Sequence, residues 1–280
     1  MKKKKKGKRG RFLRTLFLIV ILSLLAGIAY YSFYPDVSKL KRENPRKTAF
    51  MDYRQKERQA QGKKFFIKQK WVPLSKVSPY LVKAVLIAED DKFWKHEGFD
   101  FDAIQKAIER DLKEGKFKFG GSTISQQLVK NLYLSPSKNP VRKLQEAIIT
   151  WRMERNVSKR RILEIYLNVV EWGDGIFGIE AASLHNYGKS AMALSAEEAS
   201  RLAAVLPNPL KYKVKGGSAY VEKRAAIIYN IMVKRGIVIP EYEELKDSSE
   251  NGERRDSLLP EEGPEEGDAP RRQPGLQDNP

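Results

Sequence analysis

An uninterrupted apolar run near the N-terminus is the strongest hydropathy signal in the chain. Residues 15–34 contain no charged side chain, and a helix of about 20 apolar residues spans the hydrocarbon core of a bilayer. Nine Lys or Arg residues lie among the first 14, which by the positive-inside rule keeps the N-terminus in the cytoplasm and exports the rest. The pattern therefore predicts a basic cytoplasmic tail over residues 1–14 and a single transmembrane anchor over 15–34.

A cleaved signal peptide is the competing interpretation of this run, with the small residues Gly27 and Ala29 at a cleavage site. The uncleaved anchor is favoured because the apolar run continues into a cluster of aromatic residues, as at the edge of a membrane. Residues 35–70 are polar and basic. They are predicted to form a juxtamembrane linker, with the globular part beginning near Trp71.

Beyond the linker, apolar residues recur at the spacing of amphipathic helices. The first helix is expected to begin with Ser78 as its N-cap and Pro79 as its first residue. Further helices are expected at Phe101–Leu112, Leu144–Trp151, Ile162–Val169, Ala199–Leu206 and Ala219–Arg235. No convincing run of alternating polar and apolar residues indicates a strand. The chain is therefore predicted to be mainly α, with one helical domain over residues 71–240.

Local signals mark where some of these helices begin and end. Thr123 with Gln126, and Ser195 with Glu198, have the spacing of capping boxes that open a helix. A loop is expected over Glu114–Gly121. Residues 247–280 contain ten acidic and four basic residues and few apolar ones, so this acidic tail is predicted to be disordered.

The charge of the chain limits what it can bind. The formal net charge is +18, which requires an anionic partner such as nucleic acid, phospholipid head groups or a pyrophosphate substrate. The absence of cysteine excludes disulfides and thiol catalysis. Two histidines leave little for a zinc site.

Glu89 is the strongest candidate for chemistry. It lies on the apolar stripe of its predicted helix, seven residues after Val82, and a carboxylate there is costly unless it is partnered or neutral. The apolar surroundings should raise its pKa, whereas Lys92 or Lys95 should lower it. Such tuning suits a general base near neutral pH.

Two alternatives to a general base remain open for this segment. Asp90, Asp91 and Asp100 could make Glu89 part of a cation site, or the group could be a structural cluster of ion pairs. His96 could be a ligand or a base, but a hydrogen-bonded structural role is favoured for it.

A glycine-marked segment and a basic segment follow Glu89. Gly120 and Gly121 let the backbone approach a ligand closely, and the helix that opens at Thr123 presents amides to anions at its N-terminus. With Lys130 on the same helix, this segment could hold a diphosphate; the plainer alternative is a helix entry after a flexible loop. Arg142 can share a helical face with Glu146, either as a surface ion pair or to neutralise a departing pyrophosphate.

Taken in order, five motifs resemble the signatures of peptidoglycan glycosyltransferases, glycosyltransferase family 51. The motifs are Glu89–Asp100, Gly120–Gln127, Arg142–Glu146, Lys159–Ile179 and Leu194–Pro209. They cover roughly residues 71–235, and the match is nearest to the monofunctional, membrane-anchored form. The resemblance implies a lysozyme-like, mostly helical fold. It also implies that the protein polymerises lipid II into glycan strands on the outer side of the bacterial cytoplasmic membrane.

The resemblance also implies roles for individual residues. Glu89 would take the proton from the 4-hydroxyl of the acceptor sugar, which attacks the growing strand with inversion and expels undecaprenyl pyrophosphate. Glu146 would orient the substrate or the phosphate-binding cations. The remaining candidates are Lys130, Arg142 and Lys143 on the pyrophosphate, Phe93, Thr123 and Gln127 in the donor groove, and Asp90, His96, Ser122 and Gln126 as further substrate-binding residues.

The expected partners follow from that reaction. They are lipid II, the growing glycan strand and the membrane, with other cell wall synthesis proteins as conceivable partners and no nucleic acid. No cofactor or metal site is required by the motifs, although a divalent cation such as Mg²⁺ or Mn²⁺ could assist with the pyrophosphate. The alternating residues Lys116–Phe119 suit a membrane interface.

Two rival functions remain to be distinguished. A lysozyme-like hydrolase also uses carboxylates around a sugar, but cleaving a finished polymer needs no pyrophosphate site. A membrane-tethered binder of cell wall or nucleic acid would need no catalytic carboxylate at all.

Overall fold

The computed structural model describes residues 4–115, 121–137 and 139–239. The acidic tail predicted over 247–280 and the segment Lys116–Phe119 therefore lie outside the described residues.

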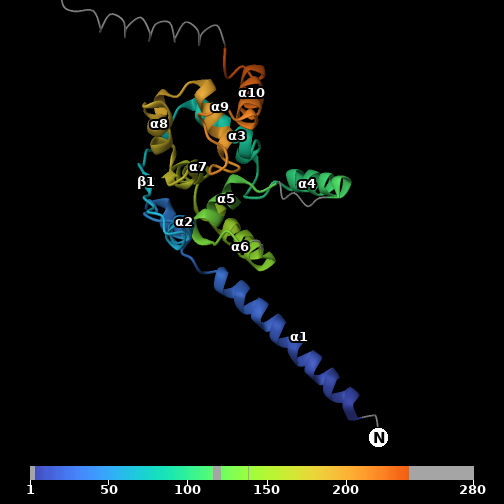
Figure 1. Ribbon diagram of the computed structural model, residues 1–280. Coiled ribbons are helices and arrows are strands. Elements are labelled where there is room, and N and C mark those ends of the chain that lie inside the picture. The colour runs from blue at the N-terminus through green and yellow to red at the C-terminus, as the bar shows by residue number, and fades with distance from the viewer. Residues whose placement is uncertain (1–3, 116–120, 138, 240–280) are drawn as a thin grey trace, which may run out of the picture. The chain divides into compact units, whose positions relative to one another are not determined.

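Helices dominate the described chain (Figure 1). The α-helices are α1 (Lys4–Tyr31), α2 (Ala49–Ala60), α3 (Pro79–Glu89), α4 (Phe101–Glu114), α5 (Ile124–Tyr133), α6 (Pro140–Asn156), α7 (Lys159–Val169), α8 (Ile179–Tyr187), α9 (Ala196–Val205) and α10 (Ala219–Lys234). Four short 3₁₀ helices are η1 (Val37–Lys41), η2 (Leu74–Lys76), η3 (Phe93–Lys95) and η4 (Ala191–Ala193). The mainly α class predicted from the sequence is confirmed.

A small sheet was missed by the sequence analysis. It consists of β1 (Lys68–Gln69), β2 (Glu171–Gly173) and β3 (Ile176–Phe177), in the order β1-β3-β2. β1 runs parallel to β3, and β2 runs antiparallel to it. Strands of two or three residues are too short to show the alternating pattern that identifies a strand.

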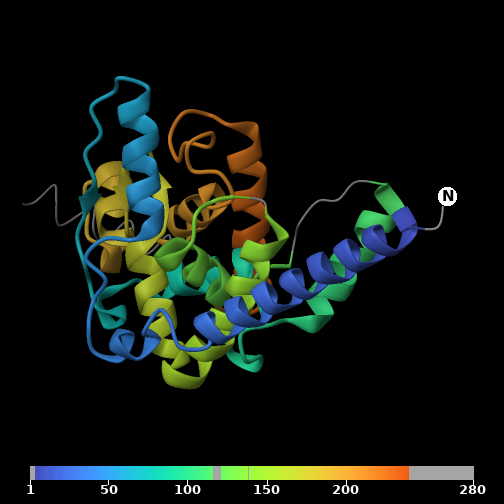
Figure 2. The same ribbon diagram turned by 90° about the horizontal axis from the view of Figure 1, so that it is seen from below.

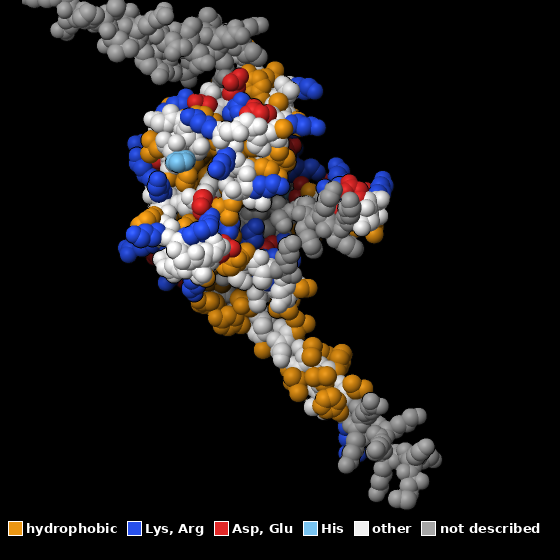
Figure 3. Space-filling model, in the orientation of Figure 1, with side chains coloured by type: hydrophobic (Ala, Val, Ile, Leu, Met, Phe, Trp, Pro, Cys, Tyr) orange, Lys and Arg blue, Asp and Glu red, His pale blue; other side chains and the backbone are white. Residues whose placement is uncertain are grey.

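Helix α1 contains the predicted membrane anchor. The stretch Gly10–Tyr31 is 22 residues long, is apolar enough to cross a membrane, and has no buried side chain. Hydrophobic side chains cover α1, whereas Lys and Arg are spread over the visible face of the helical domain (Figure 3). The helix ends at Tyr31, short of the predicted Tyr34. The Arg152 guanidinium of α6 donates hydrogen bonds to the Tyr31 carbonyl at 3.0 Å and the Phe33 carbonyl at 2.8 Å.

The prediction of a plain linker over residues 35–70 is wrong in one respect. This segment forms η1, α2 and β1, and Val37, Leu40 and Met51 are buried. Met51 is the one buried residue of α2, so the helix lacks the repeated apolar positions that would have revealed it. The segment is attached to the domain by Arg161, whose guanidinium donates to the Leu40 carbonyl at 2.9 Å.

Two groups of helices bring the candidate residues together. In both views α3, α9 and α10 lie side by side (Figures 1 and 2), and α5 packs against α6 and α7. The helix α9, opened by the predicted capping box of Ser195 and Glu198, packs its buried alanine and leucine residues against α3. This packing fixes the C-terminal end of α3, and hence Glu89, in the interior of the domain.

A buried ion pair attaches α2 to the small sheet. Arg54 Nε lies 2.9 Å from Glu171 Oε2, and the Glu171 side chain is only 2% exposed. Glu171 Oε1 has no hydrogen-bond partner among the described residues. Burial raises the pKa of the Glu171 carboxyl, and the nearby Arg54 only partly opposes that rise.

We expect the substitution Arg54→Met to lower the free energy of unfolding by about 3 kcal/mol at pH 7.5, because it leaves a buried carboxylate unpaired. The pKa of Glu171 is raised in the folded state, so the folded protein binds the extra proton. The loss should therefore shrink as the pH falls toward the ordinary glutamate value and the carboxyl becomes neutral. Thermal unfolding in detergent at pH 7.5 and pH 5 measures both effects.

The matched control is Arg58→Met on the same helix. Arg58 pairs with Asp174 at 2.6 Å, but the Asp174 side chain is 58% exposed, so its loss should cost less than about 1 kcal/mol. Equal losses for the two variants, or a loss at Arg54 that does not change with pH, would contradict the prediction.

Candidate active site

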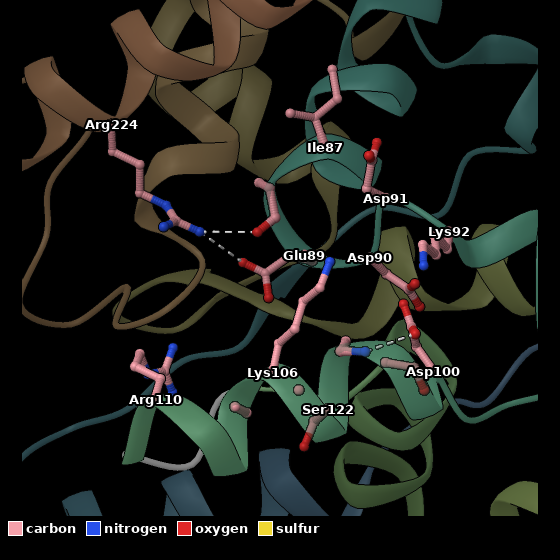
Figure 4. A pocket seen from close by; sticks show the side chains of 15 residues that line it. Ile87, Glu89, Asp90, Asp91, Lys92, Asp100, Lys106, Arg110, Ser122 and Arg224 are labelled. Carbon is pink, nitrogen blue, oxygen red and sulfur yellow. Dashed lines mark hydrogen bonds and ion pairs between the residues drawn. The ribbon is translucent and has the colours of Figure 1, made fainter. Parts of the chain in front are cut away.

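Glu89 is the last residue of α3 and lines a cavity of about 680 Å³ (Figure 4). The cavity wall also includes the side of α4 that carries Lys106 and Arg110, the entry of α5 at Gly121–Thr123, and Arg224 of α10. The Glu89 side chain is 11% exposed. A carboxyl group in this position is largely removed from water but remains accessible from the cavity.

The two oxygens of Glu89 have different surroundings. Oε2 accepts a hydrogen bond of 2.9 Å from Gln127 Nε2. Oε1 lies 3.7 Å from an Arg224 guanidinium nitrogen and accepts no hydrogen bond from the described residues. Burial raises the pKa of the Glu89 carboxyl, while Gln127, Arg224 and Lys130 partly oppose the rise. A raised pKa is what a carboxylate needs to accept a proton near neutral pH.

The predicted source of the opposing charge is wrong. Lys92 or Lys95 was expected to lower the pKa of Glu89, but the Lys92 ammonium binds Asp102 at 2.6 Å. The cations that act on Glu89 are Lys130 and Arg224. Arg224 also donates to the Ala88 carbonyl at 3.0 Å, across 136 positions of the chain.

Three cationic residues of the cavity wall were not predicted from the sequence: Lys106, Arg110 and Arg224. Lys106 and Arg110 share one face of α4, opposite the predicted apolar stripe of Ile108 and Leu112. That spacing could have marked the two cations as a pair. Nothing local marks Arg224, because its position depends on how α10 packs against α3.

Asp90 and His96 are held within the protein. Asp90 Oδ1 lies 2.9 Å from His96 Nε2, and Oδ2 accepts 2.9 Å from the backbone amide of Ile124. His96 Nδ1 accepts from the Gly98 amide at 3.1 Å. The favoured structural role of His96 agrees with these contacts, since both ring nitrogens are engaged. A substrate contact for either residue stays a prediction.

The entry of α5 differs in one way from the predicted anion cradle. The capping box of Thr123 and Gln126 is confirmed, and Thr123 Oγ1 also donates to the Gly98 carbonyl at 2.7 Å. The backbone amides of Thr123, Ile124 and Gln126 are therefore bonded to side chains. These three amides are therefore not free to bind an anion in this structure.

Gly121 has a backbone role in this entry. Its φ is +135°, and a Cβ there would lie 3.4 Å from the Ala103 carbonyl oxygen of α4. A side chain would therefore be strained in this position. Ser122 follows it, exposed at the wall of the cavity.

Phe93 does not line an open groove as predicted. Its side chain is 0% exposed within the hydrophobic core, and the Lys159 ammonium lies 4.4 Å from its ring centroid. A fully buried ring cannot contact a bound substrate in this conformation. Its apolar character in the sequence is explained by core packing.

Glu146 forms the centre of a second buried charge cluster. Its side chain is 3% exposed and binds Arg142 at 2.6 Å and Lys143. The predicted shared face of Arg142 and Glu146 is confirmed. The Lys143 ammonium also lies 3.3 Å from Ser122 Oγ, which joins this cluster to the wall of the Glu89 cavity.

Lys130 interacts electrostatically with both carboxylates. Burial lowers the pKa of its ammonium, whereas the charges of Glu146 and Glu89 oppose that shift. Glu146 does not itself line the Glu89 cavity. The Glu89 cavity and the charge cluster around Glu146 are nonetheless neighbours. Lys130 is influenced by both glutamates, and Lys143 of the cluster contacts Ser122 of the cavity wall.

A cation site made from Asp90, Asp91 and Asp100 is not observed. Asp91 pairs with Arg235 at 2.5 Å and 2.8 Å, and Asp100 caps α4 through the Ala103 amide. Within the described ranges, no group of three or more His, Cys, Asp or Glu residues is arranged to hold a metal ion.

Comparison with known proteins gives the family of the chain. A family model described as Transglycosylase matches residues 58–233. A biosynthetic peptidoglycan transglycosylase of Nitrosospira multiformis is 46% identical over 228 residues, which is 81% of this chain and 99% of that protein. Proteins of the same name are 49% identical over 185 residues in Dechloromonas aromatica (66% of this chain, 80% of that protein) and 51% over 174 in Aromatoleum aromaticum (62% and 76%). The chain therefore belongs to the transglycosylase family, among the biosynthetic peptidoglycan transglycosylases.

Proposed function

We propose that the protein polymerises lipid II by inverting transfer of a lipid-linked glycan strand to the 4-hydroxyl of an acceptor sugar. The observation that carries this proposal is the state of Glu89. It is a largely buried carboxyl with a raised pKa, and it lines a cavity whose wall carries cationic side chains. This arrangement provides a proton acceptor next to groups that attract a phosphorylated substrate.

The proposed reaction is a single displacement at the anomeric carbon of the donor. The acceptor hydroxyl gives its proton to the Glu89 carboxylate, and the hydroxyl oxygen forms the new glycosidic bond. The bond between the anomeric carbon and the pyrophosphate oxygen breaks, and its electron pair leaves with undecaprenyl pyrophosphate. Arg224 lies 3.7 Å from Oε1, so its guanidinium can steady the carboxylate and the acceptor oxygen before transfer.

The negative charge of the leaving group is assigned to the neighbouring basic cluster. Lys130, Arg142 and Lys143 converge around Glu146, and preformed cations stabilise charge that develops during bond breaking. The role proposed for Glu146 is to hold Arg142 and Lys143 in position. Ser122, bound to Lys143, connects this cluster to the cavity where the sugar would lie.

The proposed substrate also requires contact with a membrane. The candidate anchor in α1 would keep the domain at the bilayer, and the basic N-terminal residues favour a cytoplasmic N-terminus with an extracytoplasmic domain. Phe101, Ile108 and Leu112 of α4 are exposed, and they lie on the side of the helix away from Lys106 and Arg110. An apolar surface at this place fits a substrate whose lipid tail stays in the bilayer.

Product analysis separates this proposal from the rival hydrolase. The full chain in detergent is incubated with fluorescent lipid II and, separately, with isolated peptidoglycan. We expect long strands with a lipid-linked end from lipid II and no soluble fragments from the wall. Soluble fragments without strand growth would support a hydrolase, and no reaction with either substrate would support a non-catalytic binder.

A further inference from the structure

Behind Glu89 lies a chain of two hydrogen bonds that leads to a buried tyrosine. The hydroxyl of Tyr166 on α7 donates to Gln127 Oε1 at 3.0 Å. The amide of Gln127 on α5 then donates from Nε2 to Glu89 Oε2 at 2.9 Å. Tyr166 is 0% exposed and does not line the cavity, so it has no access to a substrate.

We propose that Tyr166 is a positioning residue that fixes the orientation of the Gln127 amide, so that the hydrogen bond from Gln127 to Oε2 holds the Glu89 carboxylate in place beside the cavity. This inference depends on the proposed function, in which Glu89 is the general base. It adds a residue that acts on Glu89 only through Gln127.

The chemistry of an amide explains why a second residue is needed. The Gln127 side chain can turn over and exchange its oxygen for its nitrogen with little change of shape. In the turned orientation its oxygen would face Glu89 Oε2, and two acceptors would lie 2.9 Å apart. The Tyr166 hydroxyl, donating to Oε1, stabilises the orientation in which the amide NH₂ group faces the carboxylate.

The direction of the hydrogen bonds follows from the burial of Tyr166. Burial raises the pKa of the Tyr166 hydroxyl well above its ordinary value, and the charges of Glu89 and Asp90 add to the rise. The hydroxyl therefore keeps its proton and donates it. A donor, an amide and an anion in series polarise one another, so each bond strengthens the next.

Other charged groups surround Glu89, and none of them can replace this arrangement. Arg224 approaches Oε1 from α10, Lys130 acts from α5, and Asp90 follows directly in the chain. The remaining charged side chains of the cavity wall are Asp91, Lys92, Asp100, Lys106 and Arg110. Within the described residues, only Gln127 donates a hydrogen bond to Glu89 Oε2.

The substitution Tyr166→Phe tests the inference, since it removes one buried oxygen and keeps the ring. Without the hydroxyl the Gln127 amide is less well fixed, and the Glu89 carboxylate loses part of its stabilisation. The acid limb of the kcat profile should move up by about 0.5–1 pH unit, the effect of weakening one hydrogen bond. At a pH below the acid limb we expect a loss of about 3–10-fold in kcat, with KM unchanged because Tyr166 touches no substrate.

Two further variants separate positioning from a loss of packing. Tyr187→Phe on α8 is the matched control, because its buried hydroxyl has no hydrogen-bond partner among the described residues; kcat and the acid limb should both stay as in the wild type. In a Gln127→Leu background, Tyr166→Phe should cause no additional shift, since residues that act through one another are not additive.

The possible results distinguish this inference from the proposed function. If Glu89→Gln is inactive but Tyr166→Phe has the wild-type acid limb, the positioning role is overturned and the base remains. An equal effect of Tyr166→Phe with and without Gln127 would also overturn it, because the tyrosine would then act on the fold alone. If Glu89→Gln retains wild-type activity, the base itself is rejected, and the proposed role of Tyr166 with it.

Discussion

The substitution Glu89→Gln should reduce the polymerisation rate by about 10²–10⁴-fold, the usual contribution of a general base. An amide has nearly the shape of the carboxyl group but cannot take the proton of the acceptor hydroxyl. The rate is measured with purified full-length protein and lipid II, at a pH well above the acid limb of the wild-type profile. Substrate binding should change little, so the loss should appear in kcat.

The folded state of the Glu89→Gln variant should be at least as stable as that of the wild type. The pKa of Glu89 is raised in the folded protein by burial, so at neutral pH its charged form lowers the stability, and this penalty is absent from a neutral amide. Equal or higher thermal stability together with lost activity would separate catalysis from folding. Glu97→Gln is the matched control, since Glu97 is an exposed carboxylate of the same motif. A Glu89→Gln rate within twofold of the wild type would reject the base assignment.

The helical fold could be predicted where the chain repeats its apolar positions. Helix α9 shows this well: its capping box and its alanine and leucine positions are local signals, and each is confirmed. Helix α2 and the three short strands could not be predicted in the same way. Met51 is the one buried residue of α2, and β1 forms only because the segment before Trp71 meets Ile176 and Phe177.

The candidate site was predictable as a set of motifs but not as a set of contacts. The ion pair of Arg142 and Glu146 could be predicted, because residues four positions apart on one helix lie on the same face. Arg224 and Tyr166 reach the Glu89 network from helices far along the chain, so their roles depend on packing. Phe93 was predicted to line the donor groove, but its ring is buried in the core. The sequence pattern could not distinguish these two environments, because burial depends on tertiary packing.

A second large effect is expected at Lys130. The substitution Lys130→Met should reduce kcat by about 10²–10³-fold, as does the loss of one preformed group that stabilises charge in a transition state. The charges of Glu89 and Glu146 both act on Lys130, whose side chain is half-buried, so water only partly replaces its charge. Its removal also takes a cation away from Glu89, so the acid limb should move to higher pH as well.

The two effects at Lys130 are separated by pH and by a conservative change. At a pH above the acid limb of the Lys130→Met profile, Glu89 is ionised in both proteins. Any reduction of kcat that remains there is due to weaker stabilisation of the leaving pyrophosphate. Lys130→Arg keeps the charge and should retain more activity than Lys130→Met, while the exposed Lys83→Met on α3 serves as the control with unchanged kcat. Full recovery of Lys130→Met at high pH would mean that Lys130 acts only on the base. In that case the charge of the departing pyrophosphate would have to be stabilised by Arg142 and Lys143 alone.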